Sequence, residues 1–89
     1  MTIRVKVIYS SILQQHTGVG VEELALEEGS DLHALAEEIF KRHPQLLEFL
    51  RKIPMLQIYL NGRETLPSSG TLLKDGDEIY ISPPLYEGG

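Results

Sequence analysis

Residues 30–44 read SDLHALAEEIFKRHP, and this segment sets the arrangement of the rest of the chain. Its apolar residues recur at the i, i+3, i+4, i+7 and i+8 spacing of one helical face. Ser30 or Asp31 can cap the helix by accepting hydrogen bonds from its first backbone N–H groups, and Pro44 ends it. The face is expected to consist of Leu32, Leu35, Ala36, Ile39, Phe40 and His43, with Phe40 fully buried. A helix with one apolar face requires a second layer to cover that face.

Strand patterns flank the helix on both sides. Residues 3–9 alternate between apolar and charged side chains, and residues 21–26 place Glu22, Leu24 and Leu26 on one face. Beyond the helix, strands are predicted at 55–60, 63–66 and 78–82, the last with Ile79 and Ile81 facing the core. Asn61-Gly62 between two of these strands is typical of a type I′ hairpin, whose two central residues need positive φ.

Shorter elements fill the connections. Residues 10–17 are expected to form a helical turn that ends at Gly18. Pro44 can begin a second short helix, whose inward-facing residues would be Leu46, Leu47, Phe49 and Leu50. Asp75-Gly76-Asp77 is predicted to be a turn into the last strand, rather than a calcium loop, because it lacks the ligand spacing of such a loop.

The order of these elements predicts an α+β protein with a mixed sheet of about five strands packed on one main helix. We predict that the last strand lies parallel beside the first at the centre of the sheet, which makes the fold a β-grasp of the ubiquitin-like kind. Pro83 and Pro84 cannot donate ladder hydrogen bonds, so pairing should stop there. We therefore expect one domain over residues 1–84 and a mobile tail over residues 85–89.

Composition narrows the possible functions. The chain has 89 residues and no cysteine, which excludes disulfides, zinc–thiolate sites and thiol nucleophiles. Its net charge of −5 argues against nucleic acid as a partner. No apolar run approaches the length of a membrane span, and the start lacks the apolar region of a signal peptide, so a cytosolic protein without membrane contact is expected.

Clusters of titratable residues give weaker indications. An acidic run without basic residues comprises Glu22, Glu23, Glu27, Glu28, Asp31, Glu37 and Glu38. It is interpreted as a solvated face, with a basic protein partner as the alternative. His16, His33 and His43 are too scattered to predict a metal site. No nucleophilic triad or carboxylate pair is indicated, so the domain alone is not expected to be a catalyst.

The final residues, Pro83-Pro84-Leu85-Tyr86-Glu87-Gly88-Gly89, offer a different kind of site. Two glycines form a thin backbone that can enter a narrow channel, whereas a frayed tail is the simple alternative. The two prolines fix φ and direct the tail away from the sheet. Leu85 and Tyr86 can be apolar anchors at the mouth of a partner's channel. Alternatively, Leu85 packs on the domain and the Tyr86 ring is exposed at the surface.

The strand–helix order, the Asp75–Glu78 turn, the proline pair and the Gly-Gly resemble the MoaD/ThiS sulfur carriers. Within that group the chain is most similar to the small subunits of molybdopterin synthases (molybdopterin converting factor subunit 1). The three residues Leu85-Tyr86-Glu87 form a spacer one residue longer than the resemblance leads us to expect. Tyr80-Ile81-Ser82 also differs, because aromatic residues usually come directly before the prolines.

The resemblance implies a chemical cycle at Gly89, with Gly88 beside it. An adenylyltransferase of the ubiquitin-activating type would join the carboxylate to AMP from ATP, and a sulfur donor protein would convert it to a thiocarboxylate. A synthase large subunit would then accept the tail, bound through Pro83, Pro84, Leu85 and Tyr86. No permanently bound cofactor or metal is implied. Sulfur supply to thiamine, cysteine or tRNA thiolation, a ubiquitin-like protein modifier, and an interaction domain with an inert tail remain open alternatives.

Overall fold

The computed structural model describes residues 1–51 and 56–83, and its elements follow the predicted order. The first part of the chain forms β1 (Thr2–Tyr9), α1 (Ser11–Thr17), β2 (Val21–Glu27), α2 (Leu32–Arg42) and α3 (Pro44–Leu50). The second part forms β3 (Gln57–Leu60), β4 (Arg63–Glu64), the 3-10 turn η1 (Pro67–Ser69) and β5 (Glu78–Ser82). None of the helices within these ranges is long and apolar enough to cross a membrane.

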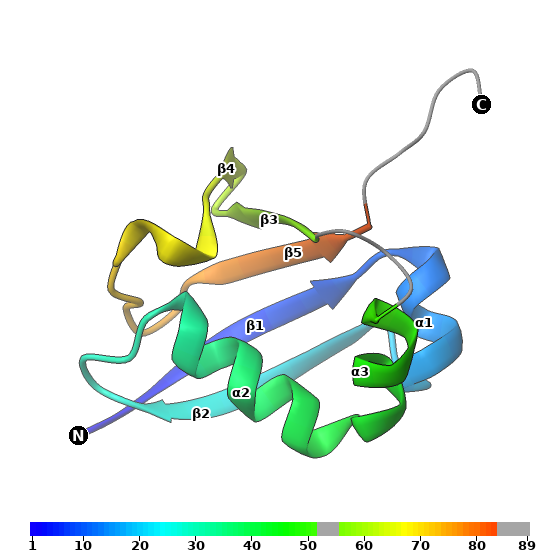
Figure 1. Cartoon of the computed structure of the whole chain (residues 1–89). Helices are drawn as coiled ribbons and strands as arrows, with labels where there is room; N and C mark the ends of the chain where they lie inside the picture. Colours follow the sequence, from blue (N-terminus) through cyan, green and yellow to red (C-terminus); the bar gives the residue numbers. More distant parts are fainter. Residues whose placement is uncertain (52–55, 84–89) are drawn as a thin grey trace.

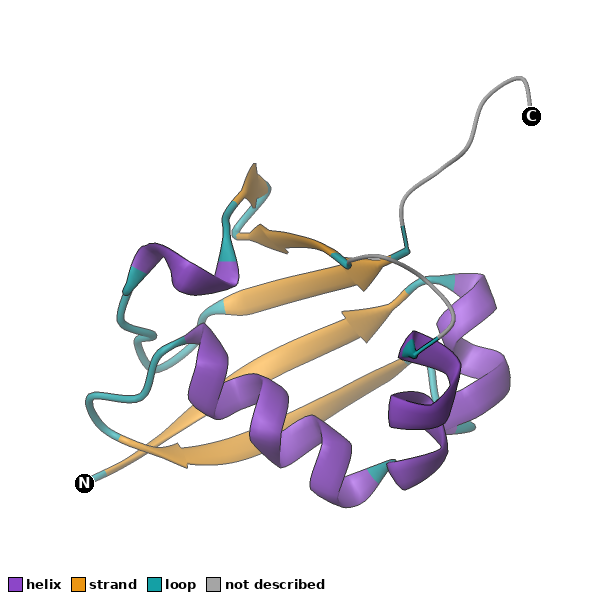
Figure 2. Ribbon diagram, viewed as in Figure 1, coloured by secondary structure: helices purple, strands orange, loops and turns teal. Residues whose placement is uncertain are grey.

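The strands form a five-stranded sheet in the order β2-β1-β5-β3-β4. The central pair, β1 and β5, is parallel, with Val7 opposite Ile79. The other neighbours are antiparallel. Figures 1 and 2 show α2 crossing one face of this sheet, with α1 and α3 together at one end. The predicted β-grasp fold, with the first and last strands as central parallel neighbours, is confirmed.

The core lies between the sheet and α2. In β1, side chains alternate between buried and exposed, as in a strand with one covered face. The buried apolar residues are Ile3, Val5, Val7, Tyr9, Leu13, Leu24, Leu26, Leu32, Leu35, Ile39, Leu46, Ile58, Leu73, Ile79 and Ile81. Asp31 provides the helix cap, since its Oδ1 accepts a hydrogen bond of 2.9 Å from the backbone N–H of Ala34.

Phe40 is only partly buried, so the prediction that it is fully buried was wrong. Leu32, Leu35 and Ile39 occupy the centre of the helical stripe and are at most 2 % exposed. Phe40 follows Ile39 by one residue, which turns it about 100° around the helix axis, to the flank of the stripe. The apolar period correctly indicated the face but overestimated its width.

Three other predictions also need correction. In α3, Leu46 is buried and Phe49 and Leu50 pack against the core, but Leu47 is 40 % exposed rather than inward. The hairpin partner strand β4 ends at Glu64 rather than at residue 66. Leu66 instead precedes Pro67 and the 3-10 turn, because proline cannot donate to a ladder. The predicted start of β3 at residue 55 lies outside the described residues, and Leu56 is not in the strand.

The predicted turns are present. Asn61 and Gly62 have φ values of 50° and 86°, the positive values that a type I′ turn requires at both positions. The Asn61 side chain also fixes the start of β5, because its Oδ1 accepts from the N–H of Glu78 at 2.9 Å. Its Nδ2 donates to Asp77 at 3.0 Å. The hairpin and the turn before β5 therefore hold each other in position.

Candidate functional site

The exit of the chain from the sheet is the part of the predicted site that the structure describes. Of the predicted residues, Pro83 is described and is buried, directly after the end of β5 at Ser82. Pro84, Leu85, Tyr86, Gly88 and Gly89 lie outside the described residues, as does the tail predicted over 85–89.

Several bonds hold this exit point. The Ser82 hydroxyl donates to the carbonyl oxygen of Pro83 at 3.0 Å, inside the protein. One residue earlier, the carbonyl oxygen of Ile81 accepts from the N–H of Ser10 at 3.0 Å. Because β5 is also paired on both sides by β1 and β3, Pro83 directly follows a strand whose two edges are both hydrogen-bonded.

The start of β5 is fixed by a turn in which two aspartate side chains accept hydrogen bonds from backbone N–H groups. Asp75 Oδ1 accepts from the N–H of Arg4, and Asp77 Oδ2 accepts from the N–H of Lys74, both at 2.8 Å. Gly76 has a φ of 88°, which favours glycine. These carboxylates shape the turn, and the described residues contain no group of three acidic, histidine or cysteine side chains that could hold a metal ion.

The face of the sheet opposite α2, which we call the open face, lies beside this exit. An apolar row crosses it, because Val21, Ile8, Tyr80 and Tyr59 are successive partners on β2, β1, β5 and β3. Val21 is 52 % exposed and Tyr80 is 39 % exposed. The next row toward the exit contains Gln57 opposite Ser82. An exposed apolar row rimmed by polar residues is typical of a protein interaction site.

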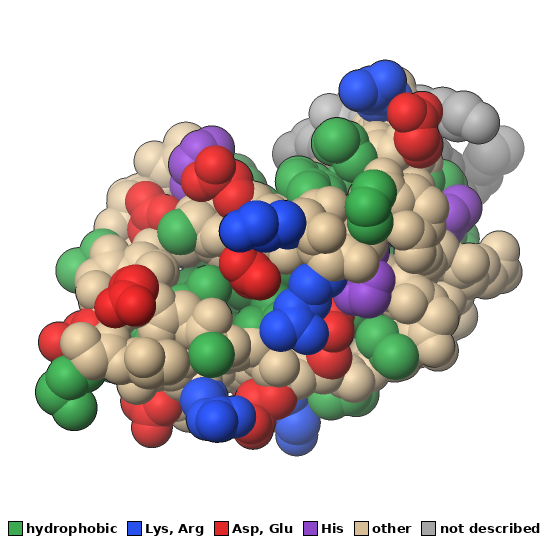
Figure 3. All heavy atoms as spheres, turned by 90° about the horizontal axis from the view of Figure 1, so that it is seen from below, with side chains coloured by type: hydrophobic (Ala, Val, Ile, Leu, Met, Phe, Trp, Pro, Cys, Tyr) green, Lys and Arg blue, Asp and Glu red, His purple; other side chains and the backbone are tan. Residues whose placement is uncertain are grey.

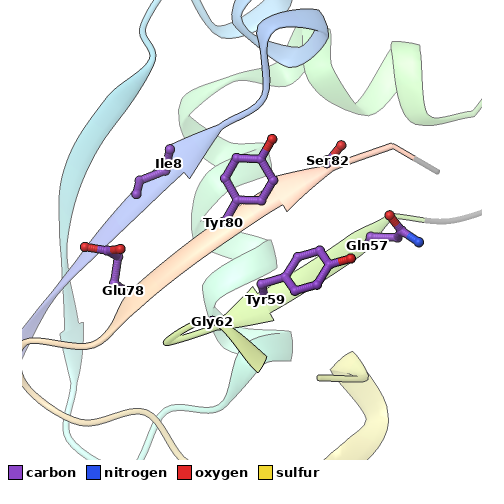
Figure 4. Close-up of a pocket in the computed structure, with 7 residues that line it drawn as sticks. All are labelled: Ile8, Gln57, Tyr59, Gly62, Glu78, Tyr80 and Ser82. Atoms are coloured by element: carbon purple, nitrogen blue, oxygen red, sulfur yellow. The ribbon is translucent and has the colours of Figure 1, made fainter. Parts of the chain in front are cut away.

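A hollow of about 450 Å³ lies on the open face. Its lining residues are Ile8, Gln57, Tyr59, Gly62, Glu78, Tyr80 and Ser82. Figure 4 shows Ser82 and Gln57 at the end of the hollow where β5 ends, and Glu78 and Gly62 toward the other end. The two tyrosine rings lie between them, with centroids 6.1 Å apart and planes inclined by 53°. The aromatic surface thus lies directly beside the exit point of the tail.

Charged residues form a second row behind the apolar one. Lys6 lies opposite both Glu23 and Glu78, and its Nζ is 3.7 Å from the Glu78 carboxylate. Arg4 forms an ion pair of 3.1 Å with Glu23. All four side chains are more than half exposed, so these pairs contribute little to stability. They instead give the open face a defined charge pattern.

A polar cluster under the sheet was missed by the sequence analysis. Oε2 of Glu22 accepts from the Tyr9 hydroxyl at 2.6 Å and lies 2.7 Å from Nε2 of His43. Arg42 approaches the other carboxylate oxygen at 3.8 Å. The Tyr9 and His43 rings meet edge to face at 5.9 Å. Two polar residues on inward-facing positions, Glu22 of the second strand and His43 of the helix face, were the available signal for this pair.

The cluster shifts two pKa values. Burial would raise the pKa of the Glu22 carboxyl, but the hydrogen bonds from Tyr9 and His43 and the charge of Arg42 outweigh it and hold the pKa below its usual value. Burial raises the pKa of the Tyr9 hydroxyl well above its usual range, and its hydrogen bond to Glu22 adds to this effect. The cluster therefore keeps Glu22 ionised and Tyr9 neutral, which is a structural role rather than a catalytic one.

The acidic run does not form one continuous patch. Glu38 pairs with Arg42 and Glu37 with His33, each at 3.8 Å, and Glu23 pairs with Arg4. Figure 3 shows acidic, basic and histidine side chains interspersed on the face seen from below. His16 stacks on Phe49 at 4.2 Å, so the three histidines lie in separate environments.

Comparison with known proteins places this fold and exit point in a family. The model of the ThiS family matches residues 7–88. The molybdopterin synthase sulfur carrier subunit of Chlamydomonas reinhardtii is 30 % identical over 86 residues, which cover 97 % of this chain and 100 % of that protein.

Two solved structures of similar proteins support the same family. A putative molybdopterin converting factor subunit 1 from Pyrococcus furiosus matches with a TM-score of 0.79 at 35 % identity, covering 93 % of this chain and 99 % of that one. The small archaeal modifier protein 1 from Methanosarcina acetivorans matches with a TM-score of 0.75 at 26 % identity, covering 99 % of both chains. The chain therefore belongs to the ThiS family, the sulfur carriers of the MoaD/ThiS type.

Proposed function

We propose that the chain carries sulfur as a thiocarboxylate on Gly89 and donates it in molybdopterin synthesis, as the small subunit of a two-component synthase. The observation that carries this proposal is the likeness to the Chlamydomonas reinhardtii subunit along that protein's full length. The likeness to the Pyrococcus furiosus converting factor supports it.

The chemistry requires activation, because an ionised carboxylate is a poor acyl donor. An adenylyltransferase transfers AMP from ATP to the Gly89 carboxylate and releases pyrophosphate. The terminal sulfur of a persulfide on a sulfur donor protein attacks the acyl carbon and displaces AMP. A second thiol then reduces the resulting acyl disulfide, which leaves the thiocarboxylate and a disulfide. The chain itself contributes no cysteine to these steps, and we propose that they take place in the cytosol, with ATP as a substrate of the activating enzyme.

The described residues support the proposal that partner proteins bind the domain, one after the other, beside the point where the tail leaves it. Ser82 and Pro83 start the tail from a strand that is paired on both sides. The apolar row of the open face lies beside this point, so a partner that takes up Pro84, Leu85, Tyr86 and Gly88-Gly89 also contacts the sheet. We propose that the activating enzyme and the synthase large subunit bind this face in turn.

A second candidate function is protein modification. The fold matches a small archaeal modifier protein along nearly the whole of both chains. In this function the activated Gly89 carbonyl is attacked by a lysine amine of a target protein, which forms an isopeptide bond and displaces the activating group. Sulfur supply to thiamine, cysteine or tRNA belongs to the same carrier chemistry with a different final partner.

Mass spectrometry of the intact protein tests the proposal. After incubation with ATP, the activating enzyme and a sulfur donor, the mass should rise by about 16 Da, as oxygen is replaced by sulfur at an activated carboxyl group. Deletion of Gly89, or addition of one residue after it, should abolish the gain. Glu48→Gln, an exposed change on α3, should not. A gain that persists in the extended chain without trimming would contradict the proposal.

The pathway is tested separately. With the synthase large subunit and the pterin precursor, the converted chain should support molybdopterin formation and return to its original mass. Conjugates that link Gly89 to lysines of other proteins, with no molybdopterin formed, would instead favour the modifier function.

A further inference from the structure

We propose that the hollow on the open face binds an arginine side chain of the protein partner that takes up the tail. The identity of that partner rests on the proposed function. The preference for arginine is argued from described residues alone, namely two tyrosine rings, two carboxylates and the apolar side chain of Ile8.

The aromatic surface comes first. Tyr59 and Tyr80 lie side by side on β3 and β5, with ring centroids 6.1 Å apart, and Ile8 lies beside Tyr80 on β1. Figure 4 shows both rings within the hollow, between Glu78 at one end and Ser82 at the other. A guanidinium group is planar and stacks on aromatic faces, and its stem is apolar. The hollow volume of about 450 Å³ has room for such a side chain.

Carboxylates stand at two sides of the rings. Glu78 lines the hollow two residues before Tyr80, and Glu64 is the cross-strand partner of Tyr59. Lys6 is the single basic residue paired with either of them in the part of the chain that the structure describes. Beside the two rings there are therefore two carboxylates, of which Glu78 is paired with Lys6, whereas Arg63 lies opposite Leu60 rather than opposite a tyrosine.

This charge pattern favours a cation over an apolar or acidic side chain. The net charge of −5 for the whole chain acts in the same direction at longer range. Arginine fits better than lysine, because its planar group can stack on a tyrosine and donate two hydrogen bonds to one carboxylate at the same time. Gln57 and Ser82 add neutral polar atoms at the end next to the tail.

The proposal is tested on the full-length protein by NMR titration with N-acetyl-arginine amide. We expect saturable shifts of backbone amides at the hollow residues, mainly in β5 and β3. N-acetyl-citrulline amide has nearly the same shape without the charge and should bind at least about threefold more weakly, as expected for the loss of an exposed cation–π and ionic contact.

Two neighbouring residues should have opposite effects. Glu78→Gln should raise the dissociation constant of the arginine compound about two- to fivefold, the range of an exposed ion pair. Lys6→Ala should lower it, because the Glu78 carboxylate loses its competing partner. Glu48→Gln removes the same charge from the far-off helix α3 and should leave the constant unchanged. Tyr80→Phe keeps the ring and should bind normally, whereas Tyr80→Leu should not.

The outcomes separate clearly. Equal binding of the arginine and citrulline compounds, weaker binding in Lys6→Ala, or no saturable shift at the hollow overturns the proposal. None of these measurements needs a thiocarboxylate. A chain that binds arginine but never gains the sulfur mass would therefore contradict the proposed function and leave this inference standing.

Discussion

Nε2 of His43 lies 2.7 Å from Oε2 of Glu22, and this contact joins the end of α2 to strand β2 across 21 residues of sequence. Tyr9 of β1 donates to the same oxygen. Strands β1 and β2 and the helix that covers them are thus connected through one carboxylate. Both side chains of this contact are largely shielded from water, with exposed fractions of 12 % for His43 and 15 % for Glu22.

Stability should depend on pH through Glu22. Its pKa is lowered in the folded protein, so the ionised form stabilises the fold. This contribution is fully present above the ordinary carboxyl pKa of 4.5 and is lost as the pH falls through the lower folded value. Glu22→Gln should therefore cost about 1–3 kcal/mol at pH 7 and progressively less as the solution is acidified below the ordinary pKa.

Urea unfolding at pH 7 and pH 3 measures this difference. Glu23→Gln is the matched control, because Glu23 is the next residue, is exposed and pairs with Arg4 at the surface; its effect should stay within about 0.5 kcal/mol. An equal loss for Glu22→Gln at both pH values would mean that the carboxylate charge is not what stabilises the cluster.

The centre and the flank of α2 should respond differently to truncation. Leu35→Ala removes a side chain that is 2 % exposed and should cost about 2–5 kcal/mol. Phe40→Ala removes a larger side chain but from a partly buried position, so its cost should fall below the range of about 3–5 kcal/mol that is usual for a buried phenylalanine. Leu66→Ala, at a residue 59 % exposed, serves as control. Thermal unfolding ranks the stabilities of the three variants. A larger loss of stability for Phe40→Ala than for Leu35→Ala would mean that the buried face of α2 extends as far as Phe40, as the sequence predicted.

Substitutions at Gly62 in the Asn61-Gly62 turn should lower stability through backbone strain alone, by an amount that depends on the new residue. A Cβ at Gly62 meets no atom within 4 Å, but its φ of 86° is unfavourable for L-residues. Gly62→Ala should therefore cost about 1–2 kcal/mol, and Gly62→Asn less, since asparagine tolerates this region. Chemical denaturation measures both free energies; equal losses would indicate a steric cause instead.

Ser82 is expected to position the tail. Its hydroxyl holds the Pro83 carbonyl at 3.0 Å inside the protein, so Ser82→Ala should cost about 1 kcal/mol of stability and should slow the mass gain at Gly89. Ser82→Thr keeps the hydroxyl and should restore the rate. An unchanged conversion rate in Ser82→Ala would limit this bond to a structural role.

Much of the fold could be predicted because the deciding signals are local. Asp31 caps α2, Asn61-Gly62 forms the type I′ turn, and residues 78–82 form β5 with the predicted bounds. In each case the residues that carry the signal are close together in sequence, so periodicity and turn chemistry were sufficient. The central parallel pair followed from the order of the elements.

The errors arise where packing between distant segments decides the outcome. The burial of Phe40 and Leu47 depends on how far the elements packed against α2 and α3 extend along their sides. The apolar period of a helix does not specify this extent. The contact between Glu22 and His43 requires knowing which strand position lies under the end of α2. At the candidate site, the sequence indicated Pro83 but not the hollow beside it, because Tyr59, Tyr80 and Ile8 come from three separate strands.

The central position of β5 also governs how the protein can be made. The backbone of Arg4 bonds to Asp75 across 71 residues, and β5 joins the β1–β2 pair to the β3–β4 pair. Two-stranded sheets are marginal in water on their own, and contacts between distant residues form slowly during folding. The four other strands are joined into one sheet only when residues 78–82 are in place, so the strand that ends at the exit point is also the last one needed to complete the sheet.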